Sequence, residues 1–123
     1  MLKNKIILVT GAAGRLGSAI AKSFINYGGR VIMVDVNFKA LKSLEAELGE
    51  DCCLALNIDI TNIKGVNQTI KKSIEKFGRI DAAIHSAYPR SPQWGKRFED
   101  IKEKHLYVDL NSQIGGSILF AQR

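Results

Sequence analysis

The chain is 123 residues long, with 46% hydrophobic and 24% charged residues, a composition that indicates one globular domain and excludes a disordered tail or a fibre. Basic residues outnumber acidic ones by 18 to 12 but are scattered along the chain, so we expect solvated helix faces and no nucleic-acid partner. No apolar run reaches the roughly 18–20 residues of a membrane helix. The N-terminus also lacks a signal-peptide pattern, so we expect a cytoplasmic protein without a membrane partner.

The predicted elements begin with a strand and an amphipathic helix. Residues 5–9 form a continuous apolar run, which is typical of a strand buried on both faces. Apolar residues then recur at helical spacing until the glycine pair at 28 and 29, which indicates a helix with one buried face. The predicted buried positions of this helix are Ala13, Leu16, Gly17, Ile20, Ala21 and Phe24.

Two more helices are predicted between three more strands. Leucines at helical spacing follow Asn37, a good N-cap residue, as far as Gly49. A second apolar stripe covers residues 63–77, and Asp59 is a candidate cap before it. The further strands are predicted at residues 30–36, 52–58 and 80–85.

The remaining stretch is a long loop followed by a helix. Residues 86–96 contain both prolines and the single tryptophan, and the length of this loop makes it a candidate functional segment. From about residue 98 the pattern is helical, with an apolar stripe from Leu106 to Ile118. Glycines 115 and 116 interrupt that stripe, which indicates close packing against a neighbour.

This alternation predicts an α/β fold with a parallel sheet and helices on both faces. Four strands in this arrangement are expected in the order 3-2-1-4, the first half of a Rossmann-type doubly wound fold. We expect residues 1–123 to form a single nucleotide-binding domain of this kind, incomplete because later strands normally continue the sheet beside the fourth.

The strongest motif joins the first strand to the first helix. Gly11 allows a tight turn, Gly14 lets the main chain approach a pyrophosphate, and Gly17 lets the helix pack closely on the sheet. Free amides and the positive end of the helix dipole then face the phosphates. Asp35 ends the second strand, where a carboxylate accepts the ribose hydroxyls of adenosine and repels a 2′-phosphate, so NAD is favoured over NADP. Arg15 weakly favours NADP instead, because it places a cation near the phosphates.

Metal and thiol chemistry is not expected. Cys52 and Cys53 are adjacent and too few for a zinc site, so we expect one buried and one half-buried free thiol. His85 is expected to be a hydrogen-bonded residue at a strand end, and His105 to face solvent.

Over its whole length the chain resembles the N-terminal half of the short-chain dehydrogenases/reductases. The resemblance rests on the glycine loop, on Asp35, on the segment 57–61 (NIDIT) and on the segment 75–81 (EKFGRID). It implies that Asp59 contacts the adenine together with the backbone of Ile60. The cofactor-binding residues expected from the motif and the resemblance are Gly11, Ala13, Gly14, Arg15, Leu16, Gly17, Asp35, Asp59, Ile60, Ser86 and Ala87.

Two departures from the family pattern stand out. In the glycine loop, Arg15 fills the place of the family's second glycine, and Gly14 comes one position earlier. After the fourth strand, residues 85–88 read HSAY where the family has Asn-Asn-Ala-Gly, which resembles a subgroup of flagellin-modification dehydrogenases associated with acidic sugars. In this loop Arg90 suits an anionic substrate, the cofactor phosphates or solvent, and the sequence leaves all three open.

No catalytic residue is assigned. The family's Tyr-x-x-x-Lys pair is absent, because Tyr27, Tyr88 and Tyr107 have no lysine four residues later, and the family's catalytic asparagine matches either Asn111 or Gln113. The resemblance implies an NAD-dependent oxidoreductase acting on a hydroxyl or ketone of a small molecule, with sugars among the substrates, which is a homo-oligomer when intact. The alternatives are a non-catalytic dinucleotide-binding module and an inactive fragment.

Overall fold

The strands pair in one four-stranded parallel sheet in the predicted order 3-2-1-4. The computed structural model describes residues 1–123. The first strand has the predicted length but begins one residue later, and the other three are one or two residues shorter than predicted. Val36 therefore lies outside the sheet and is 69% exposed. The strands are β1 (Ile6–Thr10), β2 (Arg30–Asp35), β3 (Cys53–Asn57) and β4 (Ala82–His85).

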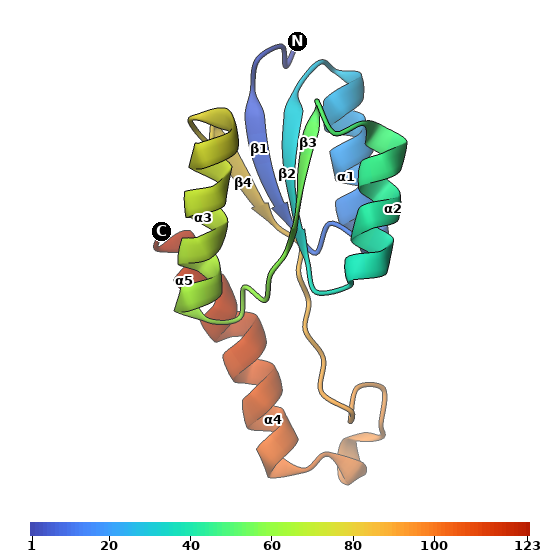
Figure 1. The fold of residues 1–123 in the computed structure, drawn as a ribbon. Helices are drawn as coiled ribbons and strands as arrows, with labels where there is room; N and C mark the ends of the chain where they lie inside the picture. The colour runs from blue at the N-terminus through green and yellow to red at the C-terminus, as the bar shows by residue number, and fades with distance from the viewer.

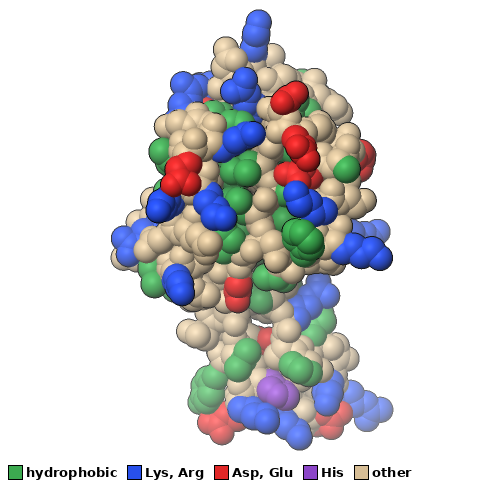
Figure 2. All heavy atoms as spheres, viewed as in Figure 1, with side chains coloured by type: hydrophobic (Ala, Val, Ile, Leu, Met, Phe, Trp, Pro, Cys, Tyr) green, Lys and Arg blue, Asp and Glu red, His purple; other side chains and the backbone are tan.

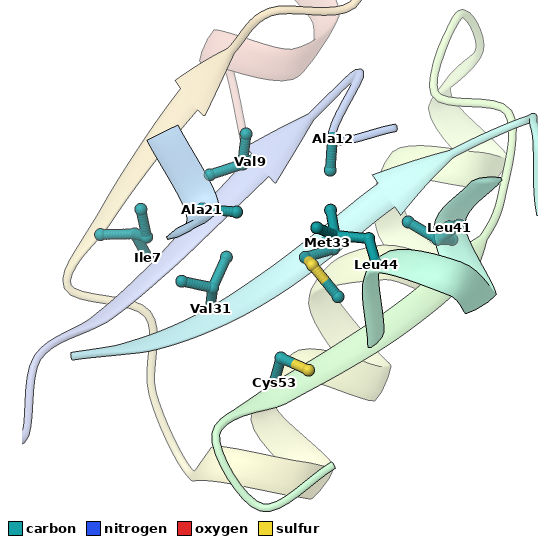
Figure 3. Close-up of a cluster of buried hydrophobic side chains, with 9 residues drawn as sticks. All are labelled: Ile7, Val9, Ala12, Ala21, Val31, Met33, Leu41, Leu44 and Cys53. Carbon is teal, nitrogen blue, oxygen red and sulfur yellow. The ribbon is translucent and has the colours of Figure 1, made fainter. Parts of the chain in front are cut away.

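Helices cover both faces of this sheet (Figure 1). Helices α1 (Arg15–Asn26) and α2 (Phe38–Leu48) lie on one face, and α3 (Ile63–Phe77) lies on the other. Figure 3 shows the first face, where Val31 and Met33 of β2 point toward Ala21 of α1 and Leu44 of α2. Alternate strand residues form a second cluster beneath Val66 of α3. The central strands are therefore buried on both faces, as their continuous apolar runs predicted.

The ends of the helices follow their capping residues. Asn37 accepts a hydrogen bond from the Ala40 amide, as predicted. Asn62, and not Asp59, caps α3 by accepting from the Gly65 amide at 3.0 Å. Asp59 lies three residues too early for this role, and its carboxylate instead accepts from the amide and the hydroxyl of Thr61.

The last quarter of the chain is not the single helix that its periodicity predicted. It consists of a 3₁₀ turn η1 (Phe98–Asp100), helix α4 (Glu103–Leu110), a π-helical turn η2 (Asn111–Gly115) and helix α5 (Gly116–Ala121). Figure 1 shows α4 extending beyond the carboxyl ends of the strands, while α5 returns beside α3. Gly116 is buried, but a Cβ at this position would lie 3.8 Å from the Cα of Thr61, which is an ordinary contact, so the packing there is not close enough to require a glycine.

Three smaller features complete the fold. Cys53 is buried and Cys52 half-buried, both as free thiols, as expected. His105 is half-buried with its Nδ1 unpartnered, so the expectation that it faces solvent was wrong. None of the helices combines the length and the apolar character that crossing a membrane requires.

Candidate functional site

A cleft of about 620 Å³ opens at the carboxyl ends of the strands, which is within the range of small-molecule sites. It brings together nine of the eleven residues expected to bind the cofactor and leaves out only Ala13 and Gly17. Parallel strands end at the same edge, so the segments that follow them meet there. The lining residues are Gly11, Gly14, Arg15, Leu16, Val34, Asp35, Val36, Ile58, Asp59, Ile60, Thr61, Ser86, Ala87, Tyr88, Pro89 and Arg90.

The glycine loop packs too closely for side chains at two of its positions. Gly11 has φ +65°, and a Cβ on it would lie 2.7 Å from the carbonyl oxygen of Ser86. A Cβ on Gly17 would lie 2.2 Å from the carbonyl oxygen of Gly11, so this glycine serves the packing of α1 against the loop. Gly14 is different, because it is exposed and a Cβ there would meet only the Gly11 carbonyl oxygen, at 3.2 Å.

The start of α1 leaves free backbone donors beside the cleft. Gly14 is the N-cap residue and no side chain caps the helix. The first helical hydrogen bond runs from the Ser18 amide to the Gly14 carbonyl, at 2.9 Å. The amides of residues 15–17 therefore have no partner within the helix. Leu16, which helical periodicity predicted to be buried, is 67% exposed and lines the cleft.

Asp35 ties the end of β2 to the glycine loop. One carboxylate oxygen accepts from the Ala13 amide at 2.9 Å, and the other accepts from the Asn37 amide at 2.9 Å. Each carboxylate oxygen retains a lone pair for a further donor. The Ala13 amide is occupied by this bond and is not available to a ligand, and Ala13 does not line the cleft.

Thr10 joins the glycine loop to the segment after β4. Its fully buried hydroxyl lies 2.9 Å from Nδ1 of His85 and accepts from the amides of Ser86 and Ala87 at 3.2 and 3.3 Å. The His85 ring also packs against Phe120, with the two ring centroids 5.0 Å apart. Burial lowers the pKa of His85 from its ordinary value of 6.5. His85 is thus a hydrogen-bonded strand-end residue outside the cleft, as expected.

Several lining residues were missed by the sequence analysis. Val36 and Ile58 directly follow the last residues of β2 and β3, Asp35 and Asn57. The sequence signal that could have found them is an apolar residue next to an acidic or polar strand end. Thr61 was noted only as the last residue of the segment 57–61, and Tyr88 only as a replacement for the family's glycine, and neither was expected to line a site. Neither candidate for the family's asparagine position lines the cleft, because Gln113 donates to the Pro89 carbonyl at 2.9 Å and Asn111 faces an apolar hollow on α4.

The family model described as short chain dehydrogenase matches residues 5–120 of the chain. The chain belongs to the short-chain dehydrogenase family. This confirms the family that the glycine loop and the strand-end residues predicted.

Relatives with known names agree with this assignment. Post-translational flagellin modification protein A of Campylobacter coli is 36% identical over 126 residues, which cover 99% of this chain and 49% of the relative. The 15-hydroxyprostaglandin dehydrogenase [NAD(+)] of Mus musculus is 31% identical over 122 residues, covering 96% of this chain and 43% of the relative. The chain therefore spans about half the length of these short-chain dehydrogenases.

Solved structures share the fold. A 3-ketoacyl-(acyl-carrier-protein) reductase of Brucella melitensis complexed with NADH has a TM-score of 0.87 and 25% identity, over 99% of this chain and 49% of that one. A short-chain dehydrogenase/reductase from the same organism has a TM-score of 0.89 over 98% of this chain and 50% of the other, and at 23% identity it supports the fold alone.

Proposed function

We propose that this chain is the cofactor-binding part of an NAD-dependent oxidoreductase that moves a hydride between nicotinamide and a hydroxyl or ketone of a small molecule. One observation carries the proposal: the uncapped start of α1, the carboxylate of Asp35 and a cleft of ligand size share one edge of the sheet. Sugars are among the substrates proposed. Under the same proposal, residues 1–123 form one incomplete domain of a homo-oligomeric dehydrogenase.

The residues present fit a dinucleotide. The free amides of Arg15 and Leu16, which line the cleft, suit a pyrophosphate, and Gly14 presents no side chain to block its approach. Asp35 has lone pairs left for the two ribose hydroxyls of adenosine. Asp59 and Ile60 would border the adenine, and the segment that starts at Ser86 would border the opposite end of the cofactor.

The carboxylate of Asp35 favours NAD. A 2′-phosphate placed on the adenosine ribose would meet this negative charge, whereas two free hydroxyls would donate to it. Arg15 also lines the cleft and would attract a phosphate, so the preference depends on which group lies nearer the ribose. We give more weight to Asp35, because the Ala13 and Asn37 amides hold its carboxylate at the end of β2.

Binding and orientation are the tasks that this chain's residues perform. When bound, NAD supplies the acceptor for the hydride. The proton of the substrate hydroxyl needs a base, and none of the three tyrosines in these 123 residues has a lysine four positions later. We therefore expect the chain to bind NAD without turning over a substrate.

Calorimetric titration of the chain with NAD and with NADP tests the proposal. We expect NAD to bind more tightly than NADP, and Asp35→Ala to weaken NAD binding roughly tenfold or more. The decisive readout is the ratio of the two affinities, because a folding defect would weaken both cofactors alike. Asp51→Ala removes an exposed carboxylate outside the cleft and is the matched control. An unchanged ratio in Asp35→Ala, or no NAD binding by the unaltered chain, would contradict the proposal.

A further inference from the structure

The loop between β4 and α4 carries a group of three side chains, Tyr88, Arg90 and Trp94, here called the Arg90 cluster. The guanidinium carbon of Arg90 lies over both rings, 5.6 Å from the centroid of Tyr88 and 5.0 Å from that of Trp94. The two rings meet edge to face at a centroid distance of 5.1 Å. Because the faces of aromatic rings attract a guanidinium, the two rings fix the position of this cation.

The backbone on either side of Arg90 is also held. The carbonyl of Pro89 accepts a hydrogen bond from Nε2 of Gln113 at 2.9 Å. The amide and hydroxyl of Ser91 donate to the carboxylate of Asp109 at 2.6 and 2.8 Å. Both neighbours of Arg90 are thus tied to the helical segment that follows the loop, so the loop presents this side chain in one place.

The charge of Arg90 has no partner in the chain. Arg90 belongs to none of the five ion pairs and donates no side-chain hydrogen bond. A guanidinium carries five N–H donors in a planar fork that matches a carboxylate or a phosphate. Contact with aromatic rings satisfies none of these donors with a hydrogen-bond acceptor. The donors of Arg90 therefore remain available for an oxyanion.

The position of Arg90 in the cleft indicates which end of a bound dinucleotide would lie beside it. Tyr88, Pro89 and Arg90 line the same cleft as Asp35, but they follow β4, and β1 separates that strand from β2. A dinucleotide in this fold lies across the point where the strand order reverses. If its adenosine ribose lies at Asp35, its nicotinamide end extends toward β4. Figure 2 shows the molecule narrowing between the layered body and the lobe formed by the loop and α4.

We infer that Arg90 is the anion-binding residue of the substrate site and that it holds a carboxylate or phosphate group of the substrate beside the reactive end of the cofactor. The inference rests on the proposed function for the neighbouring cofactor, and it narrows the substrates to anionic ones. Contact with the cofactor phosphates is the competing role for Arg90, and exposure to solvent is the third; the test separates all three.

Trp94 makes the test direct, because it is the only tryptophan of the chain and its ring packs against Arg90. Its fluorescence is followed while D-glucuronate, D-glucose 6-phosphate or D-glucose is added to the 123-residue chain in the presence of saturating NAD. These probes share one ring and differ in the group on the sixth carbon. We expect a saturable response to at least one of the two anionic sugars and none to glucose. The tighter anion identifies the group that Arg90 holds.

Two variants decide the assignment to Arg90. Arg90→Gln removes the charge and the fork, and we expect it to weaken anion binding roughly tenfold to a hundredfold. Arg97→Gln removes an exposed charge from the same segment outside the cleft and should leave anion binding unchanged.

Four outcomes would overturn the inference. They are the absence of a response, equal binding of glucose, equal binding by Arg90→Gln, and anion binding that is seen when the titration is repeated without NAD but is lost at saturating NAD. The last outcome would assign Arg90 to the cofactor phosphates. The affinity of the chain for NAD is measured beforehand by calorimetry without sugar. A failure of the proposed function would therefore be seen separately from a failure of the anion site.

Discussion

At the scale of single residues, one hydroxyl group organises the junction behind the cleft. Two backbone amides donate to Oγ1 of Thr10, which directs the hydroxyl proton of Thr10 to Nδ1 of His85. This network assigns Nδ1 as the accepting nitrogen of a neutral ring. Burial lowers the pKa of His85, which also favours the neutral form. The junction between β1 and β4 therefore depends on an uncharged histidine.

This arrangement makes stability depend on pH. In the unfolded chain, His85 takes up a proton as the pH falls below its ordinary pKa of 6.5. In the folded chain, His85 stays neutral until the pH reaches the lowered pKa of the folded state. The free energy of unfolding should therefore decrease as the pH falls from about 6.5 through the folded pKa. We expect His85→Asn, which retains an acceptor for Thr10, to reduce this slope. Urea unfolding at a series of pH values measures it.

The second histidine provides the control for that experiment. His105→Asn removes a half-buried ring on α4, whereas the bond to Thr10 is made by His85. This variant should leave the pH dependence of the free energy of unfolding unchanged. Equal slopes in the unaltered chain and in His85→Asn would show that His85 does not carry the pH dependence.

At the scale of elements, the loop after β4 depends on one carboxylate of α4. Burial alone would raise the pKa of Asp109, but the hydrogen bonds from Ser91, with smaller contributions from Gln93 and the nearby His105, outweigh it and lower the pKa below 3.8. A carboxylate whose pKa is lowered by folding stabilises the folded state fully at any pH above its ordinary pKa in the unfolded chain. This stabilisation is lost as the pH falls through the lowered pKa of the folded state. The loop should therefore stay anchored at neutral pH.

Removing this carboxylate should free the loop while leaving the sheet intact. We expect Asp109→Ala to speed hydrogen exchange at the Ser91 amide roughly tenfold or more, because that amide loses a charged acceptor. The fluorescence of Trp94 should shift as well. Amide exchange followed by NMR reports both the loop and the strands, which should keep their protection. Asp100→Ala removes an exposed carboxylate from η1 and is the control, and equal exchange at Ser91 in the two variants would show that Asp109 is not the anchor.

At the scale of the whole molecule, two apolar surfaces have no cover in this chain. Leu110, Ile114 and Ile118 are 44%, 57% and 62% exposed along one side of α4, η2 and α5. Ala82 and Ala83 of β4 are exposed at the edge of the sheet. Contiguous apolar patches and open strand edges promote association.

The 123-residue chain should therefore associate with itself. Sedimentation velocity at increasing protein concentration should show a growing fraction of larger species. Ile114→Lys places a charge in the middle of the apolar patch and should shift the distribution toward monomer. Phe38→Lys changes an equally exposed apolar residue at the start of α2 and should leave the distribution unchanged. A monomer at every concentration would contradict this prediction.

The amino-acid sequence by itself determined the order of the elements and the edge at which the site lies. Continuous apolar runs predicted strands that are buried on both faces, and glycine spacing predicted the turn into α1. These patterns are local, and the rules for parallel sheets convert them into a strand order and a common edge. That is why nine of the eleven expected cofactor-binding residues line one cleft.

Only the tertiary structure decided which side chains meet. Periodicity could not show that Leu16, in the first turn of α1, faces the cleft and not the sheet, nor that the C-terminal stripe breaks at a π turn. The contacts of the loop join residues 18 and 24 positions apart, Ser91 to Asp109 and Pro89 to Gln113. Local spacing carries no information about such pairs, because they depend on how separate elements pack. The placement of Arg90 over two rings in the cleft is known for the same reason only from the fold.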